Sequence, residues 1–307
     1  MKMIHDELKT AEIGLSQAFK NITMFPLLRQ DAAESNYLTL DEALDAGTAR
    51  VTEVSEGGSV PELLFLNEGD APVLLLDGEE LVGAKQNRVL NLSILAPANA
   101  SIKIPVSCVE AGRWSYRSRN FSSTPRHMYA KARAAKSGHV SMCMSDSGLR
   151  HSDQRALWKE IAEKSERMSV ESETGSMSDI YERKEQAMKE FVDRFKPVDS
   201  QIGAVFAINN AISGLDLFDS PDTLSKILPK LVRSYVLDAI ETPDAAEDRT
   251  DRKEAKRFVG GLAGSKFKSF PAVGMGDDLR IESRTVAGGA LVVDDRSVHL
   301  WAFPHGI

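Results

Sequence analysis

Short apolar runs alternate with clusters of polar residues between positions 73 and 109, and this alternation limits what the chain can fold into. Residues 73–76 end at an Asp-Gly turn, and residues 89–95 and 102–109 are rich in Val, Ile and Leu. Apolar runs of this length, bounded by turn residues, are typical of buried strands rather than helices. We therefore expect closely spaced strands that share one core.

Similar strand signals extend towards the N-terminus. Residues 22–28, 50–54 and 63–66 are apolar or alternate between apolar and polar, with turn residues between them. Regular short strands of this kind predict a sandwich or barrel-like β domain over residues 20–118. Within it, Thr39 and Glu42 have the spacing of a capping box, which predicts the start of a short helix.

The composition changes after residue 118, where Ser, Lys, Glu and Met become more frequent. Apolar residues at helical spacing predict an amphipathic helix over residues 153–168. Ser176 and Asp179 resemble a second capping box, for a helix that ends near residue 195. Residues 137–148 are expected to form a mobile loop. We interpret residues 119–196 as a helical connection.

The remaining part of the chain, residues 197–307, contains both strand and helix signals. Residues 202–208 and 215–218 predict a hairpin, and a helix that starts at Pro221 is expected to be kinked or divided at Pro229. The acidic residues 242–254 are expected to be an exposed loop. Terminal strands are predicted at residues 279–283, 290–293 and 298–303. The expected fold class is α+β: a β-rich N-terminal domain, a helical connection and a C-terminal α/β part.

Charge and composition exclude several classes of protein. The 307 residues carry a formal net charge of -7, which argues against a surface for a nucleic-acid polymer. The N-terminus lacks the apolar segment of a signal peptide, and no apolar run reaches the roughly 20 residues of a membrane span. Cys108 and Cys143 are too few for a disulfide framework and fit a reducing compartment. We therefore expect a cytoplasmic protein without a membrane partner.

Polar residues within the apolar stretch are the first candidates for a site, because buried polar groups are costly unless they are paired. Glu79 and Glu80 are candidate acid–base groups, with a salt bridge across a hairpin as the alternative. Only one of them should face a given site, since adjacent strand residues point to opposite sides. Gln86 and Asn87 offer amides that read a ribose or base edge, or that cap a turn.

A basic stretch follows, because residues 103–136 contain eight Lys or Arg residues and one acid, Glu110. Arginine binds phosphate with fixed geometry, and aromatic rings stack on bases. We assign phosphate binding to Arg88, Arg113 and Arg117, and stacking to Trp114. The alternative is a solvated basic surface that pairs with acids elsewhere.

Two further residues are weaker candidates. Cys108 ends an apolar strand and is either a small core hydrophobe or, if Arg113 or Arg117 lowers its pKa, a nucleophile. Asp216 is a lone acid in an apolar strand, and it is either a ligand-binding group or an exposed hairpin residue. The histidines lack metal-ligand spacing, so no metal site is predicted, and the sequence does not identify a cofactor.

The turn at residues 98–100 leads to a geometric prediction. If the flanking strands pair antiparallel through it, Arg88 lies opposite Glu110, because both are 11 residues from Asn99. Cross-strand neighbours are about 5 Å apart, so the two would form an ion pair. Gln86, Arg113 and Trp114 would then share one concave surface with that pair, where a small anion could bind. The alternative is a structural salt bridge at the base of the hairpin.

Four segments of the chain resemble a known bacterial family: LLLDGEELVGAKQNR, IPVSCVEAGRWSYRSRNFSS, GAVFAINNAISGLDLFD and PKLVRSYVLDAIE. From about residue 22 to residue 303, the chain is similar to the ARG and rhodanese-phosphatase-superfamily-associated protein family, where ARG denotes ADP-ribosylglycohydrolase. The resemblance implies that genes of this family occur together with genes for ADP-ribosylglycohydrolases and rhodanese-like phosphatases, and hence a role in NAD or ADP-ribose metabolism. It implies no catalytic residue.

Three functions follow as hypotheses, and whether the protein is an enzyme is left open. The leading one is binding or processing of ADP-ribose or a related phosphorylated nucleotide, with Glu79, Glu80 or Glu110 as the base if there is catalysis. The second is a hydrolase or transferase with Cys108 as nucleophile. The third is a non-catalytic scaffold for a partner enzyme of the ADP-ribosylglycohydrolase or rhodanese-phosphatase type.

Overall fold

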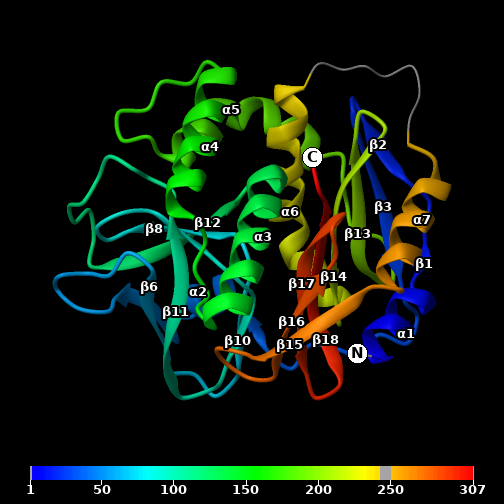
Figure 1. Ribbon diagram of the computed structural model, residues 1–307, viewed down its shortest axis with the longest axis horizontal. Coiled ribbons are helices and arrows are strands. Elements are labelled where there is room, and N and C mark those ends of the chain that lie inside the picture. Colours follow the sequence, from blue (N-terminus) through cyan, green and yellow to red (C-terminus); the bar gives the residue numbers. More distant parts are fainter. Residues whose placement is uncertain (1, 243–249, 307) are drawn as a thin grey trace.

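The computed structural model describes residues 2–242 and 250–306, and Figure 1 shows a barrel, a central group of helices and a large sheet. Within these residues the closed barrel has the strand order β11-β6-β5-β12-β8-β9. Its strands are β5 (Ala49–Glu53), β6 (Glu62–Asn67), β8 (Glu79–Gly83), β9 (Arg88–Leu90), β11 (Ala100–Cys108) and β12 (Asn120–His127). The α+β fold class with a barrel-like N-terminal part is confirmed.

Two further sheets lie in the described part of the chain. The 3-stranded sheet, in the order β10-β7-β4, contains β4 (Leu38–Thr39), β7 (Val73–Leu75) and β10 (Ile94–Ala96). The 9-stranded sheet runs β1-β3-β13-β14-β18-β17-β16-β15, and β2 pairs with β3. Its strands are β1 (Glu12–Ile13), β2 (Gln17–Phe19), β3 (Ile22–Leu28), β13 (Gln201–Ile208), β14 (Ala211–Phe218), β15 (Lys266–Pro271), β16 (Asp277–Glu282), β17 (Val286–Val293) and β18 (Arg296–Pro304).

Helices pack against the large sheet, against the barrel and against one another. They are α1 (Lys2–Thr10), α2 (Leu40–Asp45), α3 (Ala130–Ser147), α4 (Gln154–Arg167), α5 (Met177–Val192), α6 (Pro221–Glu241) and α7 (Arg252–Leu262). Figure 1 shows α1 and α7 on the outer face and α6 between the sheet and the barrel. The predicted helix at residues 153–168 and the three predicted terminal strands are confirmed by α4, β16, β17 and β18.

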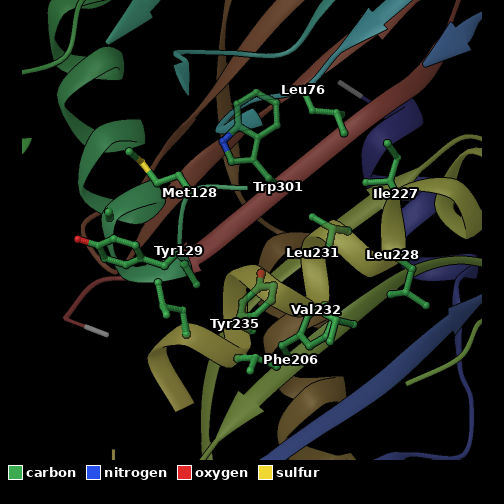
Figure 2. Packing of buried hydrophobic residues seen from close by; sticks show 14 of the residues in the cluster. Leu76, Met128, Tyr129, Phe206, Ile227, Leu228, Leu231, Val232, Tyr235 and Trp301 are labelled. Atoms are coloured by element: carbon green, nitrogen blue, oxygen red, sulfur yellow. The ribbon is translucent and has the colours of Figure 1, made fainter. Parts of the chain in front are cut away.

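The central strand β13 is buried on both faces, which explains its nearly continuous apolar sequence. On the inner face Phe206 stacks on Tyr235 of α6, with ring centroids 4.1 Å apart. Figure 2 shows this contact beside Leu231 and Val232, in the cluster that also contains Trp301 of β18. On the outer face Val205 belongs to a separate cluster with residues of α1 and α7. The sheet is therefore the middle layer of three.

The predicted mobile loop at residues 137–148 is wrong, because residues 130–147 form the helix α3, which ends at Gly148 in a left-handed conformation (φ 74°). The buried face of α3 carries Arg133, Lys136 and Ser137 where a typical amphipathic helix carries large apolar residues. The apolar periodicity that would have indicated a helix is therefore missing from the sequence. The helix is stabilised instead by charge pairing with two buried acids, Asp216 of β14 and Asp77 in the turn before β8.

The other local predictions had mixed outcomes. The capping box of Thr39 and Glu42 is present at the start of α2. Ser176 caps α5, but its hydroxyl accepts a hydrogen bond from the backbone N–H of Ser178 and not from that of Asp179. The predicted capping box of Ser176 and Asp179 is therefore wrong. Across Pro229, α6 is one continuous helix. The predicted loop at residues 242–254 falls mainly on positions 243–249, outside the described residues.

A buried charge network connects α3, β14, β18 and the turn before β8. Arg133 donates to both carboxylate oxygens of Asp216 at 2.7 and 3.2 Å, and its Nε lies 3.5 Å from Asp77. His299 bridges Asp216 at 3.2 Å and the Ser93 hydroxyl at 2.7 Å. These side chains are buried, so each charge depends on its partners in the network to offset the cost of burial. The network therefore holds the barrel against the large sheet.

His127 is expected to make the stability of the protein depend on pH. The imidazole is fully buried, neither ring nitrogen has a hydrogen-bond partner among the described residues, and burial lowers its pKa well below the usual value. Below its unfolded-state pKa of about 6.5, the unfolded chain binds a proton that the native state excludes, so stability falls as the pH falls.

We expect the free energy of unfolding, measured in urea, to decrease between pH 7 and pH 5 by up to about 1.4 kcal/mol per pH unit for this residue. His127→Leu should reduce that slope, whereas His305→Leu, at an exposed position, should leave it unchanged. An equal slope in the wild-type protein and in His127→Leu would contradict the assignment.

Candidate functional site

Three loops meet at one end of the barrel, and they carry most of the predicted site residues. They are residues 54–61 between β5 and β6, residues 84–87 between β8 and β9, and residues 109–119 between β11 and β12. The antiparallel pairing of β9 with β11, of β8 with β12 and of β5 with β12 brings these loops to the same end. Segments far apart in the sequence thus form one surface.

Arg113 joins two of these loops. Its Nε and Nη2 donate to the Glu110 carboxylate at 2.9 and 2.7 Å, and its Nη1 donates to the carbonyls of Ala84 and Ser115 at 2.7 and 2.8 Å. Every nitrogen of the guanidinium therefore donates within the protein. This makes Arg113 a clamp between the loops rather than a free phosphate ligand.

Glu110 is fully buried inside this clamp. Burial alone would raise the pKa of its carboxyl group, but hydrogen bonds from Arg113, the Asn87 backbone and Thr174 outweigh that effect and lower it. The carboxylate is thus ionised and fully engaged. A general base needs a carboxylate oxygen that is free to accept a proton from the substrate, and the Glu110 carboxylate does not offer one in this arrangement.

Gln86 and Asn87 extend the network around Glu110, and Asn87 connects it to α5. Gln86 donates to the Glu110 carbonyl, and Asn87 donates to the Ser178 hydroxyl at 3.1 Å. Ser178 in turn donates to Glu80 at 2.8 Å, so Glu80 is part of the same network. Burial raises the pKa of Glu80 although the Arg126 charge opposes this.

Arg88 does not lie opposite Glu110, so the predicted cross-strand pair is wrong. In the β9–β11 ladder Arg88 is opposite Cys108, because residues 91–96 leave the barrel to form β10 and the turn near Asn99 does not close a simple hairpin. Glu110 pairs with Arg113 and, at 3.8 Å, with Arg117. The Arg88 guanidinium instead lies 5.6 Å from the centre of the Trp114 ring.

Cys108 is buried, and burial raises the pKa of its thiol to about 11 although the Arg88 charge opposes the shift. At neutral pH the group is therefore a thiol and a weak nucleophile. Its backbone N–H and carbonyl are both bonded to the Gln154 side chain at 2.8 Å, which fixes the end of β11 against α4.

The exposed part of the barrel end is aromatic and basic. Trp114 is 47% exposed, and Tyr116 is 52% exposed. The Lys85 ammonium lies 5.4 Å from the Trp114 ring centre and 5.0 Å from that of Tyr116. A pocket of about 910 Å³ opens beside the Tyr116 ring, and it is lined by Thr52, Glu53, Ser55, Glu56, Tyr116, Arg117, Ser118 and Arg119.

Two predicted site residues lie elsewhere. Glu79 pairs with Lys230 of α6 at 2.6 Å, facing away from the clamp. Asp216 is fully buried in the network with Arg133, so it is not an exposed hairpin residue. The basic stretch also divides, since Arg133 and Lys136 enter the core, while Lys131 pairs with Glu160.

The sequence interpretation missed Glu53, which lines the pocket and is only 8% exposed. One signal was present: Ala49, Val51 and Glu53 occupy alternate positions of one strand, and the first two face the barrel core. An acid at the third such position indicates a polar group turned inward. Tyr116 and Arg119 were also not assigned to the site.

Comparisons with known proteins identify the family. No curated protein and no solved structure matches the chain. The family model described as the ARG and Rhodanese-Phosphatase-superfamily-associated Protein domain, ARPP-1, matches residues 10–303. This match covers nearly the whole chain and confirms the resemblance carried by the four sequence segments. The chain therefore belongs to the ARPP-1 family, whose name associates it with ADP-ribosylglycohydrolase and rhodanese-phosphatase systems.

Proposed function

We propose that this protein binds ADP-ribose or a related phosphorylated nucleotide in the pocket at the barrel end. The observation that carries the proposal is the combination of an exposed aromatic ring, Tyr116, with two exposed arginines, Arg117 and Arg119, on the wall of one pocket. Its volume of about 910 Å³ is within the usual range for small-molecule sites.

Each part of such a ligand has a matching group. Guanidinium groups bind phosphate oxygens through charge-assisted hydrogen bonds, and Arg117 and Arg119 are at the surface where a diphosphate has access. The rings of Tyr116 and Trp114 offer faces on which a base stacks.

The family supports the same class of ligand. The family name records an association with ADP-ribosylglycohydrolase systems, and this supports ADP-ribose as the proposed ligand. An ADP-ribosylglycohydrolase or a rhodanese-phosphatase-type enzyme is accordingly the proposed partner. Co-purification of the tagged protein with such an enzyme tests that part.

The double variant Arg117→Ala/Arg119→Ala is expected to weaken ADP-ribose binding about tenfold or more for each arginine, because a hydrogen bond to a charged group contributes about 1.5–3 kcal/mol. Isothermal titration calorimetry at two salt concentrations measures this. Arg183→Ala, on the exposed face of α5, is the control and should bind like the wild-type protein. Equal dissociation constants for the double variant and the control would refute the phosphate role.

A further inference from the structure

Two buried side chains of opposite charge, Arg88 and Glu53, lie at this end of the barrel, and each has polar atoms without a hydrogen-bond partner among the described residues. Arg88 is fully buried, its Nη1 donates to the Gln86 side chain at 3.0 Å, and its Nε and Nη2 have no hydrogen-bond partner among the described residues. Glu53 accepts from the Lys85 backbone at 3.3 Å through Oε1, and its Oε2 has no partner in the same part of the chain. Buried groups of this kind usually have partners, and a ligand that both donates and accepts hydrogen bonds would satisfy these atoms.

Both side chains point into the same end of the barrel. Glu53 follows Val51 at alternate positions of β5, and Arg88 precedes Leu90 in the same way on β9. Val51 and Leu90 belong to the barrel core, so Glu53 and Arg88 share its interior side. Burial lowers the pKa of Arg88, and the Glu53 charge is close enough to oppose that shift.

The loop of residues 55–58 covers this end of the barrel. Gly58 packs closely on the residues beneath the loop: a Cβ added there would lie 3.2 Å from Glu53 Oε2 and 3.3 Å from the Trp114 ring. Two long side chains fasten the loop: Lys85 Nζ donates to the Gly57 carbonyl at 2.8 Å, and Tyr116 donates to the Glu56 carbonyl at 3.3 Å. Tyr116 is also part of the wall of the pocket.

We propose that Glu53 and Arg88 form an inner subsite that takes the terminal ribose of ADP-ribose when the loop of residues 55–58 is released. This inference rests on the proposed function, in which the base and the diphosphate occupy the outer pocket. A ribose is the group that suits the two side chains, because each hydroxyl donates to a carboxylate oxygen and accepts from a guanidinium nitrogen. A phosphate at the same place would satisfy Arg88 but would be repelled by Glu53.

The test compares ADP-ribose with ADP, which lacks the terminal ribose, by isothermal titration calorimetry. The wild-type protein is expected to bind ADP-ribose at least tenfold more tightly than ADP. Glu53→Gln keeps the acceptor for the Lys85 backbone but replaces the free carboxylate oxygen with an amide, so it should bring the ratio of the ADP-ribose and ADP affinities close to one. Glu68→Gln, at the other end of the barrel, should keep the preference.

The possible failures are distinguishable. If ADP and ADP-ribose bind the wild-type protein equally, or if Glu53→Gln weakens both equally, the inner subsite is refuted and the outer pocket stands. If neither ligand binds, the proposed function itself is refuted.

The role of the loop has its own test. Lys85→Met keeps the packing of the stem but removes the ammonium that holds the Gly57 carbonyl, so it should accelerate association of ADP-ribose several-fold in stopped-flow measurements. An unchanged association rate would show that the loop does not control entry.

Discussion

Replacing Asp216 with alanine is expected to destabilise the protein by about 3–5 kcal/mol, because it leaves the Arg133 charge buried without its bidentate partner. The same change removes the carboxylate oxygens that are hydrogen-bonded to Tyr235 and His299.

The contribution of Asp216 to stability also depends on pH. Burial opposes ionisation of Asp216, but the Arg133 charge and the His299 hydrogen bond hold its pKa far below the usual value. The stabilisation is therefore complete above the unfolded-state pKa of about 4 and is lost as the pH falls below it.

Urea unfolding of the Asp216→Ala variant at pH 7 measures the loss. The control is Glu254→Ala, which breaks the exposed ion pair with Arg257 and should cost less than about 1 kcal/mol. The double variant Asp216→Leu/Arg133→Met removes both charges, and it should recover part of the lost stability, since no charge is then left unpaired. If Asp216→Ala is no less stable than Glu254→Ala, the buried network does not hold the barrel to the sheet.

Replacing Arg113 with alanine is expected to have a similarly large effect, about 3–5 kcal/mol, because Glu110 would remain buried without its main partner. The change also removes donors to the carbonyls of Ala84 and Ser115, which position the loops at the barrel end. Thermal and urea unfolding should both report the loss.

Arg117→Ala is the matched control for stability, because Arg117 pairs with the same carboxylate at 3.8 Å but its side chain is 57% exposed. We expect this variant to lose less than about 1 kcal/mol. Its effect should appear in ligand binding instead. Equal stability losses for the two arginine variants would contradict the distinction between a buried clamp and an exposed ligand group.

Sequence patterns predicted the strands of this fold well, because apolar runs bounded by turns depend on local chemistry. They could not predict where each strand pairs. Residues 22–28, placed by sequence in the N-terminal domain, form β3, which pairs with β13 some 180 residues later in the chain. The division into three domains therefore remains a prediction. The helix α3 was missed for a different reason, since its buried face is charged and small rather than apolar.

The candidate site was predicted in part. The loops around residues 86 and 113 do meet, because both follow strands whose neighbours were recognisable in the sequence. The predicted ion pair failed because the register depended on a hairpin that the chain does not form. Glu53 was missed because it is the last residue of β5, a strand far from Arg88 in the sequence. Only the closure of the barrel brings the two residues to the same end.

Titration of the wild-type protein with ADP-ribose in a calorimeter, at low ionic strength and pH 7, tests the assignment of the barrel end most directly. We predict saturable binding of one ADP-ribose per chain, weakened by added salt because the arginines bind phosphate electrostatically. Absence of saturable heat at ligand concentrations up to the millimolar range, with a folded protein, would contradict it.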